Sequence, residues 1–110
     1  MNKLEPGILM PVNYVRTIDG DTISFSITRT FNIRLRDIDV YELDTKLGKE
    51  AKDYVATLLR FAKDIKVFIP TNNPEKLMDF NSFERIVGDI YIDNVSLKSL
   101  LEEKGYNKDI

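Results

Sequence analysis

Three segments near the start of the chain have the residue pattern of β-strands, and short turn signals separate them. Residues 8–18 are apolar enough for a strand, and residues 22–28 and 32–37 alternate apolar with polar side chains. Asp19-Gly20 is a strong hairpin signal between the first two segments, and Arg29-Thr30 marks a second tight turn. We therefore expect the first third of the chain to be an antiparallel meander.

After the meander, the period of the apolar residues changes from two to that of a helix. Residues 48–63 are expected to be helical, with Thr45 as the N-cap. The apolar stripe of this helix consists of Ala51, Tyr54, Val55, Leu58 and Ala62.

The last third of the sequence predicts two more strands and a short helix. The strands are residues 65–69 and 85–92, separated by a long connection over residues 71–84. Asp93-Asn94 is a turn signal, and Ser96 is expected to cap a helix that ends at Gly105.

The order β-β-β-α-β-β-α predicts the fold class. It is the order of a mainly β, α+β protein: a five-stranded OB-fold barrel with two helices. Five-stranded sandwiches and other α+β arrangements fit the pattern as well. We expect a flexible lead-in over residues 1–7 and a single domain over residues 8–110.

Two absences from the composition exclude several kinds of chemistry. The chain has no cysteine and no histidine, which excludes disulfides, thiolate zinc sites and Ser–His or Cys–His nucleophiles. Any catalysis must rest on carboxylates, lysine, tyrosine, hydroxyls or an oxygen-ligated ion. The net charge of −2 and the pI of about 5.1 count against a tight, non-specific nucleic-acid binder.

The sequence also bears on location. No apolar run approaches the ~20 residues that span a bilayer. The first eleven residues contain an acid and two prolines in place of the apolar core of a signal peptide. We expect a cytoplasmic protein as the chain stands, or a secreted one if a leader was removed.

Charged residues gather at the ends of two predicted strands. Asp21 is in phase with the buried face of the 22–28 strand, at its mouth. The polar face of the 32–37 strand carries Arg34 and Arg36. Three acidic residues follow in the sequence: Asp37, Asp39 and Glu42. Taken singly, these residues are a turn acid, a solvated strand face and loop acids. Taken together, they also fit a phosphate grip beside a metal site.

Four short motifs occur in a defined order along the chain. They are Asp19-Gly20-Asp21-Thr22, Arg34-Leu35 followed by Asp39 and Glu42, Gly48-Lys49-Glu50-Ala51, and Phe83-Glu84-Arg85. In order and spacing, they resemble the motifs of the staphylococcal (micrococcal) nuclease family, a thermonuclease-like domain. The resemblance extends over roughly residues 12–105.

The resemblance implies a metal-dependent nuclease that hydrolyses phosphodiesters of DNA, RNA or both and leaves 3′-phosphates. The implied ligands of Ca²⁺, or of another hard divalent cation, are Asp21, Asp39 and the main-chain carbonyl of Val40, all oxygen donors. The implied catalytic residues are Glu42, which activates water, and Arg34 and Arg85, which donate to the phosphoryl oxygens. We expect a monomer with nucleic acid as its substrate and no membrane partner. Asp19 is a candidate acid that supports the metal ligands without binding the cation itself, and Arg36 is expected to contact only solvent or the DNA backbone.

The sequence departs from the family pattern near these residues. Tyr41 stands where the family has a proline, and Glu84 stands where the family has a glycine beside its second arginine. Ser82 and Phe83 align with a lysine and a base-stacking tyrosine of the best-known member. These departures and the acidic charge motivate an alternative: a non-catalytic, nuclease-like OB domain that binds nucleic acid or protein.

Overall fold

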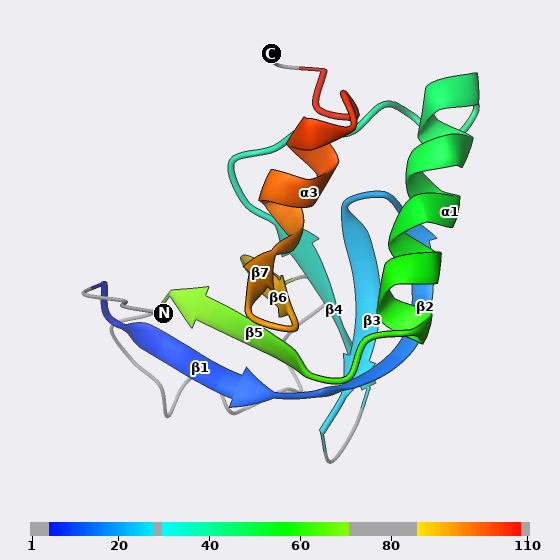
Figure 1. The fold of residues 1–110 in the computed structure, drawn as a ribbon. Helices are drawn as coiled ribbons and strands as arrows, with labels where there is room; N and C mark the ends of the chain where they lie inside the picture. The colour runs from blue at the N-terminus through cyan, green and yellow to red at the C-terminus, as the bar shows by residue number, and fades with distance from the viewer. Residues whose placement is uncertain (1–4, 28–29, 71–85, 109–110) are drawn as a thin grey trace.

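The computed structural model describes residues 5–27, 30–70 and 86–108. Over these residues it has a mixed α+β architecture, with two helices and one seven-stranded sheet (Figure 1). The strands are β1 (Gly7–Pro11), β2 (Asn13–Asp19), β3 (Thr22–Ser26), β4 (Thr30–Leu35), β5 (Ile65–Pro70), β6 (Ile86–Ile92) and β7 (Val95–Ser96). The helices are α1 (Lys46–Arg60) and α3 (Leu97–Glu103).

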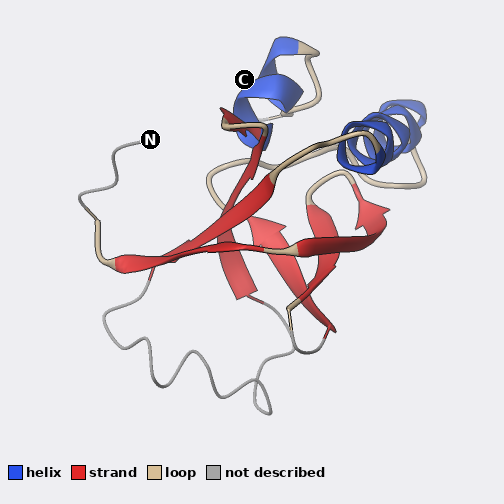
Figure 2. Cartoon of the chain, turned by 60° about the horizontal axis from the view of Figure 1, so that its bottom comes forward, coloured by secondary structure: helices blue, strands red, loops and turns tan. Residues whose placement is uncertain are grey.

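The strands follow the order β1-β5-β6-β4-β3-β2, and the short β7 pairs with β6 off this path. The predicted meander is confirmed, because β2, β3 and β4 pair antiparallel in sequence order. β4 and β6 pair in parallel, and the other ladders are antiparallel. Both helices lie on the same side of the strands (Figure 2).

The strand count differs from the five that the sequence predicts. The predicted strand over residues 8–18 divides at Val12, because β1 pairs with β5 whereas β2 pairs with β3. A seventh strand, β7, forms where the Asp93-Asn94 turn folds the chain back onto β6. Among the described residues no ladder joins β1 to β2, so the hydrogen-bonded sheet is open and not closed as a barrel.

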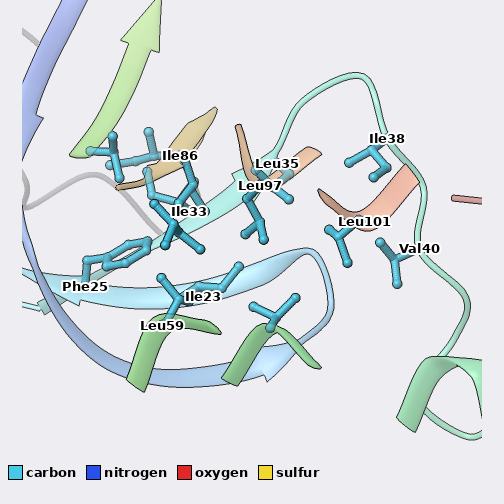
Figure 3. Packing of buried hydrophobic residues seen from close by; sticks show 14 of the residues in the cluster. Ile23, Phe25, Ile33, Leu35, Ile38, Val40, Leu59, Ile86, Leu97 and Leu101 are labelled. Atoms are coloured by element: carbon cyan, nitrogen blue, oxygen red, sulfur yellow. The ribbon is translucent and has the colours of Figure 1, made fainter. Parts of the chain in front are cut away.

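One apolar core lies between the sheet and the helices. The alternation of β4 is confirmed, since Phe31, Ile33 and Leu35 are at most 6% exposed. α1 buries Ala51, Val55 and Leu59, and α3 buries Leu97 and Leu101. Figure 3 shows these two helices and the sheet meeting in a single cluster. Three residues of the predicted apolar stripe of α1 are only partly buried and pack against the edge of this cluster: Tyr54, Leu58 and Ala62.

The predicted caps and turns are confirmed where the structure describes them. The Thr45 side chain accepts a hydrogen bond from the Gly48 N–H at 3.0 Å, and Ser96 caps α3. Asp93 and Asn94 have φ values of 49° and 69°, as a tight hairpin turn of this type requires. The predicted 71–84 connection lies outside the described residues. Within the described ranges, no helix combines the length and apolarity needed to cross a membrane.

Candidate functional site

The end of β4 redirects the chain and so positions the acids that follow it. The Leu35 N–H donates to the Asp21 carbonyl at 3.0 Å, and the Arg36 N–H donates to the Gly88 carbonyl at 3.1 Å. Asp37 then adopts a left-handed conformation with φ of 59°, which aspartate tolerates better than most residues. This turn shifts the alternation of buried and exposed side chains by one residue, so Ile38 and Val40 are buried (Figure 3). The alternation in the sequence fails at Ile38 for this reason.

Asp21 is a buried acidic residue immediately before the first residue of β3. It is 8% exposed, and its Oδ2 accepts a hydrogen bond from the Val40 N–H at 3.3 Å. Burial raises the pKa of Asp21 to about 6, and the hydrogen bond and charge of Asp19 act in the same direction. Arg34 and the Val40 N–H oppose this rise. Asp19 supports the turn as well, since its Oδ1 accepts from the Asp21 N–H at 3.2 Å.

Arg34 lies between two carboxylates. Its Nη2 is 3.4 Å from Asp21 Oδ2 and 3.9 Å from Asp39 Oδ1, and its Nη1 donates to the Leu35 carbonyl. The Arg34 side chain is 22% exposed and that of Asp39 is 44% exposed. The guanidinium is therefore hydrogen-bonded to the backbone through Nη1, and part of it remains accessible to solvent.

Glu42 lies in the loop that joins this acidic segment to α1. Its carbonyl accepts from the Thr45 N–H at 3.0 Å and from Thr45 Oγ1 at 2.6 Å. Gly48 permits this close packing, because a Cβ there would overlap the Glu42 carbonyl and lie 2.8 Å from the Tyr41 carbonyl oxygen. The Glu42 side chain itself is 67% exposed. The backbone of the loop is thus fixed against α1 while the carboxylate faces solvent.

The donor set suits a hard cation. The carboxylates of Asp21 and Asp39 face the same guanidinium nitrogen, and Val40, between Asp39 and Tyr41, offers a main-chain carbonyl. Carboxylate and carbonyl oxygens are the ligands that Ca²⁺ takes, with water or substrate completing the shell. Within the described ranges no group of three or more His, Cys, Asp or Glu side chains converges as a metal cage. A cation here would therefore depend on two carboxylates and share them with Arg34.

The predicted site residues are brought together in part. Asp21, Arg34, Asp39 and the Val40 backbone are in contact, and Glu42 lies in the same loop. Arg85 lies outside the described residues, as does Glu84, so the predicted second arginine has no position here.

Arg36 does not face solvent alone. Its guanidinium forms two hydrogen bonds with Asp89, both at 2.9 Å, and two with Glu5, at 2.8 and 2.7 Å. The same group lies 5.8 Å from the centre of the Phe68 ring. Arg36 therefore ties the end of β4 to β5, β6 and the segment before β1.

Two further residues lie at this site that were not predicted from the sequence, Asn107 and Lys108. They follow α3 and pair with residues 39–45, which we call the acidic loop. Val40 and Asn107 form an antiparallel bridge, and the Lys108 N–H donates to the Asp39 carbonyl at 2.9 Å. Lys108 Nζ is 2.5 Å from Glu42 Oε1 and 3.5 Å from Asp39 Oδ2. No periodicity or motif in the sequence links position 108 to position 42.

The fold and the site together define a mixed α+β domain with an arginine and several acids at the end of an interior strand.

No family model matches the chain. Three curated proteins of Oryza sativa subsp. japonica are similar to it. Probable staphylococcal-like nuclease CAN2 is 30% identical over 80 residues, which is 73% of this chain and 19% of that protein. CAN3, with the same description, is 29% identical over 80 residues, again 73% of this chain and 19% of that protein. CAN1, also so described, is 33% identical over 79 residues, which is 72% of this chain and 21% of that protein.

These matches identify a staphylococcal nuclease-like domain in the chain. The chain spans about a fifth of the length of the curated relatives it matches.

Proposed function

We propose that this domain is a nuclease that hydrolyses phosphodiester bonds in DNA, RNA or both, with Ca²⁺ or another hard divalent cation. The observation that carries the proposal is the position of Arg34, whose Nη2 faces both Asp21 and Asp39. A guanidinium held in this way presents its free N–H groups in a fixed orientation, which suits the oxygens of a phosphate. The printed descriptions of the three relatives as probable staphylococcal-like nucleases support the same activity.

Each site residue has a role in this proposal. Asp21, Asp39 and the Val40 carbonyl would hold the cation, which would supply positive charge to the phosphate. Arg34 would donate hydrogen bonds to the phosphoryl oxygens as their negative charge grows in the transition state. Glu42 would orient a water molecule and accept its proton, because the chain has no histidine to act as the base. Arg85 would be the second arginine by its place in the sequence motif.

We further propose that the sheet is a variant of the five-stranded OB arrangement. β1 and β2 are consecutive and separated only by Val12, and they occupy the two ends of the strand path. The Val12 N–H donates to the Ile65 carbonyl at 3.1 Å, which continues the pairing with β5. Considered as one bent strand, β1 and β2 would bring the path back to its start.

One observation favours a second function, that of a nuclease-like domain that binds nucleic acid without cleaving it. Lys108 Nζ contacts the Glu42 carboxylate at 2.5 Å. A carboxylate oxygen that already accepts a hydrogen bond from an ammonium group is not free to orient a water molecule. In this alternative, Arg34 would still bind phosphate, but water would not be activated.

The two functions are separated by an assay with the purified protein. Plasmid DNA and RNA are incubated with Ca²⁺ or with EDTA, for the wild type, Glu42→Gln and Arg34→Gln. Glu103→Gln is the matched control, because Glu103 is an exposed acid at the end of α3. The nuclease proposal predicts Ca²⁺-dependent cleavage that falls about 10²-fold or more in the two site variants and is unchanged in the control. No cleavage above the Glu42→Gln background, with retained binding of single strands that Arg34→Gln weakens, would support the second function.

A further inference from the structure

The segment formed by Asn107 and Lys108 is fastened to the acidic loop by its backbone. Val40 and Asn107 form an antiparallel bridge, and the Lys108 N–H donates to the Asp39 carbonyl at 2.9 Å. The Asn107 side chain accepts from the Asp39 N–H at 3.3 Å and donates to Glu102 at 3.1 Å. Asn107 is only 6% exposed. The position of the Lys108 backbone beside Asp39 is therefore set by the fold, not by its own side chain.

This fixed backbone places the Lys108 ammonium on two acids of the site. Its Nζ is 2.5 Å from Glu42 Oε1 and 3.5 Å from Asp39 Oδ2. The hydrogen bond to Glu42 and the charges of both acids raise the pKa of Lys108, so the group stays protonated at neutral pH. Exposed ion pairs are usually weak because two long side chains must be ordered. Here the anchored backbone keeps the ammonium near the acids even when the contact itself opens.

We infer that Lys108 is an internal counter-ion of the site, which competes with the divalent cation for the carboxylate of Asp39 and at the same time binds the carboxylate of Glu42. The inference rests on the proposed metal site. A cation held by Asp39 would lie within several ångströms of the ammonium, and like charges at that distance repel. Binding of the cation would thus require the ammonium to move away from Asp39 and would release Glu42 from its hydrogen bond. Lys108 is in this sense a positioning residue that sets both the affinity for the cation and the freedom of Glu42.

The test is calorimetric titration of Ca²⁺ into the metal-free protein, without nucleic acid. The variants are Lys108→Gln, Lys108→Arg and the control Lys63→Gln, which removes an equal charge beyond the far end of α1. We expect Lys108→Gln to bind Ca²⁺ about 5–10-fold more tightly than the wild type at low ionic strength. Because the effect is electrostatic, the ratio should shrink toward about 2 at an ionic strength near 1 M. Lys108→Arg should retain the wild-type affinity, and Lys63→Gln should differ from it by less than about 2-fold.

Each result decides the inference. Tighter binding by Lys108→Gln, or binding seen only in that variant, supports it. Equal or weaker binding by Lys108→Gln, with a wild type that binds, overturns it and leaves the proposed nuclease intact. Absence of Ca²⁺ binding in every variant overturns it together with the proposed Ca²⁺ site. The backbone contacts do not depend on the side chain, and thermal melts of each variant verify that the fold is retained.

Discussion

Gly48 is the residue whose substitution most directly tests how the acidic loop is held. A Cβ added at this position would overlap the Glu42 carbonyl oxygen and lie 2.5 Å from the Glu42 carbonyl carbon and 2.8 Å from the Tyr41 carbonyl oxygen. Ordinary contact with a Cβ begins at 3.4 Å. Since the crowded atoms are backbone, Gly48→Ala must push the loop away from α1 by about 1 Å.

Two opposing effects set the change in stability. Alanine is a better helix former than glycine by about 1 kcal/mol. Forcing an extra methyl into a packed contact costs about 1–3 kcal/mol, and a backbone obstacle places this case at the upper end. Displacement of the Glu42 carbonyl also disturbs its two hydrogen bonds from Thr45. We therefore expect Gly48→Ala to lower the free energy of unfolding by about 1–2 kcal/mol.

The measurement combines urea unfolding with amide chemical shifts of residues 39–45. The matched control is Asn94→Ala in the turn between β6 and β7, where φ is 69° and a similar loss of about 1–2 kcal/mol is expected from backbone strain alone. Only Gly48→Ala should shift the amides of the acidic loop. Any nuclease activity should then fall about 10²-fold, because a displacement of this size misplaces Glu42.

A Gly48→Ala variant that is as stable as the wild type, with unchanged amide shifts in the loop, would refute this steric conflict. That result would mean that α1 and the loop are further apart than the structure has them.

Two more substitutions test the electrostatics of the site. Burial raises the pKa of Asp21 to about 6, above its value in the unfolded chain. Its contribution to stability is therefore present below about pH 4 and lost as the pH rises through about 6. Asp21→Asn should accordingly gain stability relative to the metal-free wild type between pH 4 and pH 8, by at most about 3 kcal/mol. A difference that stays flat over this range in urea unfolding would contradict the prediction. Arg36→Gln should lower the free energy of unfolding by about 1–3 kcal/mol, because it removes the hydrogen bonds from the guanidinium to Asp89 and Glu5. Its rate of hydrolysis per folded molecule should be unchanged, and a loss comparable to that of Arg34→Gln would show that Arg36 also binds substrate.

Much of the candidate site was predictable from the sequence because its parts are local. The phase of Asp21 with the buried face of β3 predicts its burial, and the structure has it 8% exposed. The failure of the alternation at Ile38 marks the turn at Asp37, which is left-handed. Motif order and spacing then select Arg34, Asp39 and Glu42 as a group.

Arg34 and Arg36 show where such reasoning ends. The two residues have the same period and the same face in the sequence, yet Arg34 faces the acids of the site and Arg36 is bound to Glu5 and Asp89. The partners of Arg36 come from β6 and from the segment before β1, which are distant from it in the chain. Periodicity reports which face a side chain is on, but it does not report what another strand brings to that face.

The sequence by itself determined the antiparallel meander, helices α1 and α3, the turns and caps among the described residues, and the buried face of β4. Each of these depends on neighbours a few positions apart, through the periods of strand and helix and the side chains that cap or turn the chain. Only the tertiary structure decided that the predicted first strand divides between two partners at Val12. It alone brought Lys108 onto Asp39 and Glu42. These are contacts between segments far apart in the chain, and they arise only when α3 packs on the common core and carries the chain back to the acidic loop.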